Sequence, residues 1–308
     1  MVASTSTDRA LAGFAEAVGT TGPVAAVGNH TRSHLGGPLE PDTLELRCPT
    51  GIVSYQPDEM TVQVRAGTSV ADLHAALGEA GQRSALPDRG GTVGGAIAVG
   101  ENALEVLGRG RLRDSVLQVR YVSAEGEIVA SGGPTVKNVS GFNLPKVMVG
   151  SLGTLGLVGE VTLRTNPVPA LTQWYRADEV DPQQAIDAVL RPGAVLWNGH
   201  ATWVLLEGHM PDVKAELGRL DRLADFSEVV APPDLPAHRW SLPPSEVTNL
   251  PDRTPSSGNF VALFGVGTVH ATEPQPPRSP DQASVEVAAR MKLLFDPTGR
   301  LAPGRSPI

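Results

Sequence analysis

Three glycine-rich segments of this sequence could bring bare peptide N–H groups against a phosphate-containing ligand. They are "VGNHTRSHLGGP" (27–38), "LPDRGGTVGGAIAVG" (86–100) and "MVGSLGTLGLVGEV" (148–161). A glycine inside a regular element costs about 0.5–1 kcal/mol relative to alanine, so this density needs a physical reason. Successive N–H groups in such loops form concave nests that bind anions without basic side chains. The pattern therefore predicts close approach of the backbone to a ligand, with Arg32 as an additional charged donor.

The spacing of the glycines excludes two common nucleotide-binding motifs. The sequence has no Gly-Lys-Ser/Thr, which excludes a P-loop, and no Gly-x-Gly-x-x-Gly that opens a helix, which excludes the Rossmann fingerprint. An NAD-dependent enzyme is therefore disfavoured. A dinucleotide held mainly by main-chain nests is compatible with the sequence.

Composition limits the classes of partner. The chain has 308 residues, of which 41% are hydrophobic, enough for a core divided between two domains. A formal net charge of -8 argues against nucleic acid or an anionic membrane as the main partner. Cys48 is the only cysteine, so the chain has no internal disulfide, as is common in a reducing compartment. No signal-peptide pattern and no membrane-spanning stretch is present, so we expect a cytoplasmic protein.

Hydrophobic periodicity predicts alternating short strands and helices. The alternation in "TVQVRAG" (61–67) predicts a half-buried strand, and Ser69 is a suitable cap for a helix over 69–81. Composition changes after Pro169, where proline-rich loops become frequent, which places a domain boundary near 168–172. Further strands are expected at 23–27, 115–131 (two strands joined by a turn), 157–165, 201–208 and 259–267, and further helices at 181–190, 212–226 and 281–296.

Several segments agree, in order, with one known family. They are "TVQVRAGTSVADLHAALGEAGQ", "LPDRGGTVGGAIA", "GRLRDSVLQVRYVSAEGEIVASGG" and "VKNVSGFNLPKVMVGSLGTLGLVGEVTLRTNPVP", preceded by the glycine loop at 27–38 and followed by the tail "FDPTGRLAPGR". Together they resemble the FAD-binding domain of the vanillyl-alcohol oxidase / para-cresol methylhydroxylase family, in particular its GlcE-type glycolate oxidase subunits. The resemblance covers about residues 22–169.

The resemblance implies an α+β fold in which a two-subdomain FAD-binding domain (1–169) precedes a smaller α+β substrate or cap domain (170–308). It also implies three groups of FAD-binding residues. Those expected at the pyrophosphate are Gly28, Asn29, His30, Thr31, Arg32, Ser33 and His34. Those expected along the flavin and pyrophosphate are Pro87, Thr92, Val93, Gly94 and Gly95. Those expected near the adenosine half are Gly153, Gly156, Leu157 and Val158.

The function implied by the resemblance is oxidation of a 2-hydroxy acid by FAD within a glycolate oxidase complex. The expected partners are a second FAD subunit and an iron–sulfur subunit, through which the chain could associate with a membrane. Two alternatives remain open. The chain could be a non-catalytic or degenerate scaffold subunit, or a stand-alone flavin-dependent oxidase of an alcohol or sugar acid.

Two segments depart from the family pattern. The first loop reads Gly28-Asn29-His30-Thr31 where the family usually has Gly-Gly-Gly-Thr, and "AIAVGENALEV" (96–106) replaces an Ala-Asn-Ala-Ser-Gly-like stretch. These departures predict altered contacts on the flavin side of the site. The second domain is also short, which predicts a reduced substrate pocket.

Oxidation of a 2-hydroxy acid needs a base for the hydroxyl proton and a cation for the carboxylate. Candidate bases in the second domain are His200, His209 and His270, and Arg239 is a candidate carboxylate ligand. Each could equally be a surface or packing residue. His30 and His34 lie four residues apart, but their loop is not a helix and no metal site is expected; covalent attachment of the flavin to either histidine is an open alternative. Cys48 is interpreted as a small buried residue.

Overall fold

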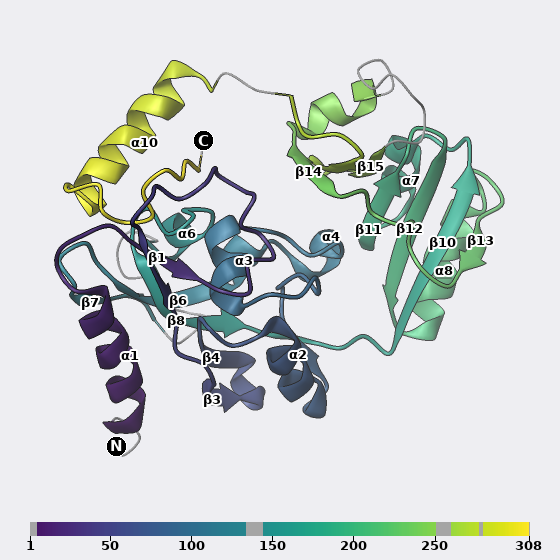
Figure 1. The fold of residues 1–308 in the computed structure, drawn as a ribbon. Coiled ribbons are helices and arrows are strands. Elements are labelled where there is room, and N and C mark those ends of the chain that lie inside the picture. Colours follow the sequence, from purple (N-terminus) through teal and green to yellow (C-terminus); the bar gives the residue numbers. More distant parts are fainter. Residues whose placement is uncertain (1–4, 134–143, 251–259, 277–279, 308) are drawn as a thin grey trace. The chain divides into compact units, whose positions relative to one another are not determined.

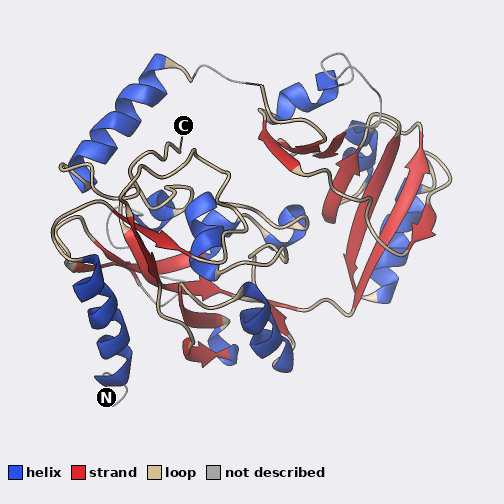
Figure 2. Cartoon of the chain, in the orientation of Figure 1, coloured by secondary structure: helices blue, strands red, loops and turns tan. Residues whose placement is uncertain are grey.

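The computed structural model describes residues 5–133, 144–250, 260–276 and 280–307 (Figures 1 and 2). The chain divides into two compact units. The first comprises Met1–Ala103, Arg111–Val168 and Ser279–Ile308, and the second comprises Leu104–Gly110 and Pro169–Arg278. This division differs from the expected domains at two segments: 104–110 is grouped with the second unit and 279–308 with the first. Each of these segments is grouped with residues that are far from it in the sequence.

The main sheet of the first unit is antiparallel, and its strand order across the described residues is β3-β4-β8-β6-β7. The central strand β8 (Leu157–Arg164) is buried along almost its whole length, and its buried Glu160 accepts hydrogen bonds from Gln63 Nε2 at 2.6 Å and Arg120 Nη1 at 3.3 Å. The expected helix at 69–81 is confirmed as α2 (Val70–Glu79), and the Ser69 side chain caps it by accepting a hydrogen bond from the Asp72 N–H at 3.0 Å. The other strands of this sheet are β3 (Ile52–Gln56), β4 (Thr61–Arg65), β6 (Val116–Val122) and β7 (Ile128–Gly132).

A second glycine-rich segment forms a helix where a loop was expected. Helix α3 (Val93–Val99) begins at Thr92, whose hydroxyl accepts a hydrogen bond from the Gly95 N–H, and it ends at Gly100 with φ +70°. The helix packs against the backbone of Ala66: a Cβ at Gly94 would lie 2.8 Å from the Ala66 Cβ and 3.0 Å from its carbonyl oxygen. Glycine is therefore needed at this position for close packing, although its intrinsic helix propensity is poor.

The C-terminal tail returns to the first strand of the chain. Strand β1 (Val24–Val27) pairs in parallel with β2 (Leu44–Arg47) on one side and with Leu301 on the other. Figure 1 shows the yellow tail beside β1. The tail follows helix α10 (Gln282–Phe295), which the sequence predicted at 281–296. The small strands β5 (Gln82–Arg83) and β9 (Asn166–Pro167) complete the described pairings of this unit.

Arg300 joins the tail to the N-terminal helix α1 (Thr5–Val18), an element that the sequence analysis did not identify. The buried guanidinium donates to five carbonyl oxygens, including those of Val18 at 2.7 Å and Ala124 at 3.1 Å. The other three acceptors are the carbonyls of Gly19, Thr21 and Gly22. A cation at the C-terminal end of α1 also offsets the negative pole of that helix.

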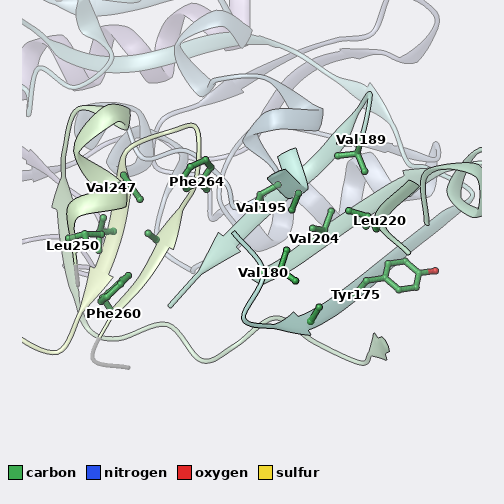
Figure 3. Close-up of a cluster of buried hydrophobic side chains, with 14 of the residues drawn as sticks. Tyr175, Val180, Val189, Val195, Val204, Leu220, Val247, Leu250, Phe260 and Phe264 are labelled. Carbon is green, nitrogen blue, oxygen red and sulfur yellow. The ribbon is translucent and has the colours of Figure 1, made fainter. Parts of the chain in front are cut away.

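The second unit is an antiparallel sheet with the order β13-β10-β12-β11-β15-β16-β14 in the described chain. Its strands are β10 (Leu171–Asp178), β11 (Pro192–Trp197), β12 (Ala201–Gly208), β13 (Ser227–Val229), β14 (His238–Ser241), β15 (Phe260–Leu263) and β16 (Thr268–Ala271). Helices α7 (Pro182–Ala188) and α8 (Met210–Leu220) pack beside β11 and β12. Figure 3 shows part of the resulting core, including Val195, Val204 and Leu220.

The short helix α4 (Val106–Arg109) belongs to the second unit because of its packing. Val106 is buried in a cluster with Trp174, Leu196 and Trp203 of the sheet. Arg176 stacks on Trp203, with its guanidinium carbon 5.4 Å from the ring centroid. The remaining short helices of the described chain are η1 (Pro57–Glu59), α5 (Leu112–Ser115), α6 (Leu144–Met148) and η2 (Pro244–Asn249).

Candidate cofactor-binding crevice

The three glycine-rich segments meet in the first unit, where they line one crevice. Thirteen of the residues that the resemblance implies at FAD are part of its lining: Gly28, Asn29, His30, Thr31, Arg32, Ser33, Thr92, Gly94, Gly95, Gly153, Gly156, Leu157 and Val158. Three others lie outside the lining. His34 is exposed, Pro87 is buried, and Val93 is fully enclosed in the hydrophobic core.

The first loop presents unpaired backbone donors. His30 has φ +54°, so the left-handed conformation falls on a histidine where the family usually has glycine. Among the described residues, the N–H groups of Asn29, His30, Thr31 and Arg32 find no hydrogen-bond acceptor. Four successive free donors next to a left-handed residue have the character of an anion-binding nest.

Arg32 lies beside this nest and is held by two other loops. Its Nε donates to the Glu101 carboxylate, and its Nη1 donates to the Gly90 carbonyl at 2.9 Å and to the Thr31 hydroxyl at 3.1 Å. Glu101 also lies 3.4 Å from Nη1 of Arg89. Arg32 and Glu101 are both buried, yet Arg32 Nη2 has no partner among the described residues. A buried donor of this kind calls for an acceptor, which the described residues do not supply.

The glycines of 148–161 serve more than one purpose. Gly150 and Gly153 have φ of +88° and +80°, and this left-handed backbone conformation favours glycine independently of the neighbouring atoms. A Cβ at Gly156 would lie 2.4 Å from the Tyr121 ring, and one at Gly159 would lie 2.3 Å from Leu11 of α1. The interpretation that all four bring backbone to a ligand is therefore wrong for Gly159, whose close neighbour is a helix. Gly153 and Gly156 do line the crevice.

The charge of the crevice suits an anion. None of its described lining residues is acidic, although the whole chain has a net charge of -8. The two arginines in the lining are Arg32 and Arg305. The sequence analysis did not identify Arg305, and the only available signal was the similarity of the tail that contains it. Other lining residues that it missed are Ala26, Val27, Ala66, Gly67, Ala98, Val99, Ser151 and Leu152, together with Cys48.

An extended dinucleotide fits these residues. Position 28 has no room for a side chain, because a Cβ there would lie 2.5 Å from the Thr92 hydroxyl oxygen. Free N–H groups and an incompletely satisfied arginine face the same space, while Leu157 and Val158 add apolar surface. This combination of bare backbone, cation and apolar wall is what a diphosphate joined to ring systems requires.

Cys48 lines the crevice as an unreactive thiol. Its Sγ donates to the Val158 carbonyl at 3.4 Å, and burial raises the pKa of the thiol from 9.0 to about 12. At pH 8 the thiolate fraction is therefore about 100–1000-fold below that of an unfolded cysteine. We expect iodoacetamide to alkylate Cys48 about 100–1000-fold more slowly in the native protein than in the urea-unfolded protein. The alkylation rate of the native protein should rise as the pH increases. Mass spectrometry over time measures both rates, and equal rates would contradict the environment described for Cys48.

The catalytic candidates of the second unit are only partly brought together. Arg239 of β14 and His270 of β16 lie opposite each other in the strand register, and His270 is 2% exposed. His200 is exposed, with Nε2 3.7 Å from the Asp178 carboxylate, and exposed His209 precedes α8.

Within the described chain, no group of three or more His, Cys, Asp and Glu residues is arranged to bind a metal ion. No helix among the described residues has the length and apolarity needed to cross a membrane.

Known proteins resemble the chain in sequence and in fold. Residues 2–132 match the family described as "FAD binding domain". The glycolate oxidase subunit GlcE of Escherichia coli (strain K12) is 33% identical over 211 residues, which are 65% of this chain and 60% of GlcE. A D-lactate dehydrogenase of Anaerostipes hadrus is 34% identical over 123 residues, 38% of this chain and 25% of that protein. The chain thus spans less than two thirds of the length of either relative.

The fold also matches that of a solved structure. An alkyldihydroxyacetonephosphate synthase superposes with a TM-score of 0.67 at 13% identity, covering 96% of this chain and 73% of that one. At this identity the likeness concerns the fold alone, and it confirms the expected α+β architecture. Residues 2–132 are thus similar to known FAD-binding domains, and this similarity supports FAD as the cofactor.

Proposed function

We propose that the chain is an FAD-dependent oxidoreductase that oxidises a 2-hydroxy acid as one subunit of a glycolate-oxidase-type complex. The observation that supports this most directly is the crevice itself, in which Arg32 and four free N–H groups face a space without acidic residues. The similarity to GlcE and to a D-lactate dehydrogenase supports the substrate class, because both act on small 2-hydroxy acids by name.

Each unit contains candidate residues for the proposed reaction. Residues 28–33, 92–95 and 153–158 of the first unit would hold FAD, which when bound supplies a hydride acceptor. In the second unit, Arg239 would bind the substrate carboxylate through its planar fork. His270, its neighbour across the strand pair, would accept the hydroxyl proton. His200 and His209 are the other candidate bases.

The proposal includes partners and a location. The expected partners are a second FAD subunit and an iron–sulfur subunit, and the expected location is cytoplasmic, with any membrane association through those partners. The small size of the second unit supports a role within a complex, because a short cap domain offers little substrate-binding surface of its own.

The test is a flavin assay followed by a substrate screen. The purified chain is loaded with FAD, freed of excess cofactor and mixed anaerobically with glycolate or D-lactate. We expect the visible flavin absorbance to bleach with at least one of them. Acetate and propionate, which have the carboxylate but no hydroxyl group, serve as controls and should leave the spectrum unchanged.

Other outcomes separate the alternatives. A yellow protein that bleaches only with an alcohol or a sugar acid would support a stand-alone oxidase. A yellow protein that bleaches with none of these compounds, alone or with its partner subunits present, would contradict catalysis and support a scaffold that binds FAD.

A further inference from the structure

The C-terminal tail is built into the wall of the crevice. After Leu301 pairs with β1, the Ala302 N–H donates to the Val24 carbonyl at 2.8 Å, and the Ser306 N–H donates to the Gly36 carbonyl at 2.8 Å. The Glu40 N–H donates in turn to the Pro303 carbonyl at 3.0 Å. These bonds fix the tail across the segment that follows the first glycine loop.

The turn that precedes the tail is equally well fixed. The Asp296 carboxylate is 2% exposed and accepts from the Leu301 N–H at 2.7 Å, the Arg300 N–H at 3.1 Å and Lys292 Nζ at 2.6 Å. Arg300 binds the carbonyls at the end of α1, as described above. The backbone at residue 305 is therefore held in place from both sides before any ligand is considered.

Arg305 emerges from this fixed backbone with unsatisfied hydrogen-bonding capacity. Its side chain lines the crevice, and its Nε is buried without a partner in the described part of the chain. Arg305 also borders a second hollow, between α10 and residues 147–155, whose described lining contains no acidic residue. Lys292, the other cation there, already donates to the carbonyls of Thr154 and Leu301 and to Asp296. Neither hollow supplies a carboxylate for Arg305.

We propose that Arg305 is a cofactor-binding residue whose guanidinium pairs with the diphosphate of FAD, together with Arg32. The inference rests on the assignment of FAD to the crevice. Each of the two phosphates has one negative charge, and the lining offers two arginines, each with a buried guanidinium nitrogen that has no acceptor among the described residues. Arginine is well suited to this role, because its fork forms charge-assisted hydrogen bonds to phosphate oxygens.

The two arginines come from nearly opposite ends of the chain, so FAD binding and tail docking are coupled. A ligand that binds only the form with the tail in place stabilises that form, and the effect is reciprocal. FAD should therefore protect the tail, and loss of the Arg305 side chain should weaken FAD binding without altering the fold of the apoprotein.

The experiment compares Arg305→Met and Arg305→Lys with Arg290→Met. Arg290 lies exposed on α10, so its variant removes the same charge from the same region without touching the crevice. FAD affinity is measured by quenching of flavin fluorescence at several salt concentrations, and the melting temperature of each apoprotein is measured alongside. This readout needs no substrate, so it is independent of whether the chain oxidises a 2-hydroxy acid.

We expect Arg305→Met to raise the Kd for FAD about 10–100-fold and to reduce its salt dependence. Arg305→Lys should lose less affinity, because it keeps the charge but not the fork, and Arg290→Met should bind like the unchanged protein. All three apoproteins should melt within about 2 °C of the unchanged one. Unchanged FAD affinity in Arg305→Met would overturn the inference, as would a loss of affinity accompanied by an equal loss of apoprotein stability or by unchanged salt dependence.

Discussion

Replacement of Arg32 by methionine should raise the Kd for FAD at least about 100-fold, because it removes a buried cation that is next to four free N–H donors. The same change should lower the melting temperature of the apoprotein. It leaves the buried Glu101 carboxylate with Arg89 as its remaining described cationic neighbour, and breaking a buried pair costs about 3–5 kcal/mol. Flavin fluorescence titration and thermal unfolding measure the two effects.

A double variant separates the two effects of the Arg32 change. In Arg32→Met with Glu101→Gln, the uncompensated buried charge is gone, so we expect about half or more of the lost stability to return. FAD affinity should stay low, because the cation is still missing. Recovery of FAD binding together with stability would show that Arg32 acts only through the fold, contrary to its placement at the diphosphate.

Replacement of Arg300 by methionine should destabilise the first unit by about 3–5 kcal/mol, one of the largest effects expected of a single change. Five carbonyl oxygens lose a charged donor at once: four are at the end of α1 and in the residues just beyond it, and the fifth is that of Ala124 after β6. For a unit of this size we expect the melting temperature to fall by about 10 °C or more. Differential scanning calorimetry of the apoprotein measures the change.

Arg9→Met is the matched control for Arg300. Arg9 is exposed on α1 itself, so its variant removes the same charge from the same helix but leaves the five carbonyls satisfied. We expect its melting temperature to stay within about 2 °C of the unchanged protein. If both variants melt alike, the five-fold hydrogen bonding of Arg300 does not contribute to stability as described.

Elements with a strong local signal could be predicted from the sequence. Strand 61–65 shows alternation of buried and polar positions, and helix 70–79 begins at a serine cap. Helix 93–99 could not be predicted in this way, because Gly94, which weakens its intrinsic propensity, is required by the close approach of Ala66, 28 residues earlier in the chain. Helix 5–18 packs its Leu11 against Gly159, another contact that only the folded chain reveals.

The same limit applies to the crevice. The glycine-rich segments were recognisable because glycine allows the backbone to approach a ligand closely. The order of the motifs along the chain indicated FAD as that ligand. The ion pair between Arg32 and Glu101 was not predictable, because the two residues are 69 positions apart and no local sequence pattern indicates that they interact. Arg305 follows the whole second unit in sequence, so only the tertiary structure brings it to the lining.

The pairing of Leu301 with Val24 has a consequence for biosynthesis. The first unit is interrupted by residues 169–278, and its strand β1 gains its second neighbour only when residue 301 is available. During translation the second unit can leave the ribosome and fold while the first still lacks its closing segment. Capture of the cofactor should therefore follow the synthesis and docking of the segment that contains residue 301.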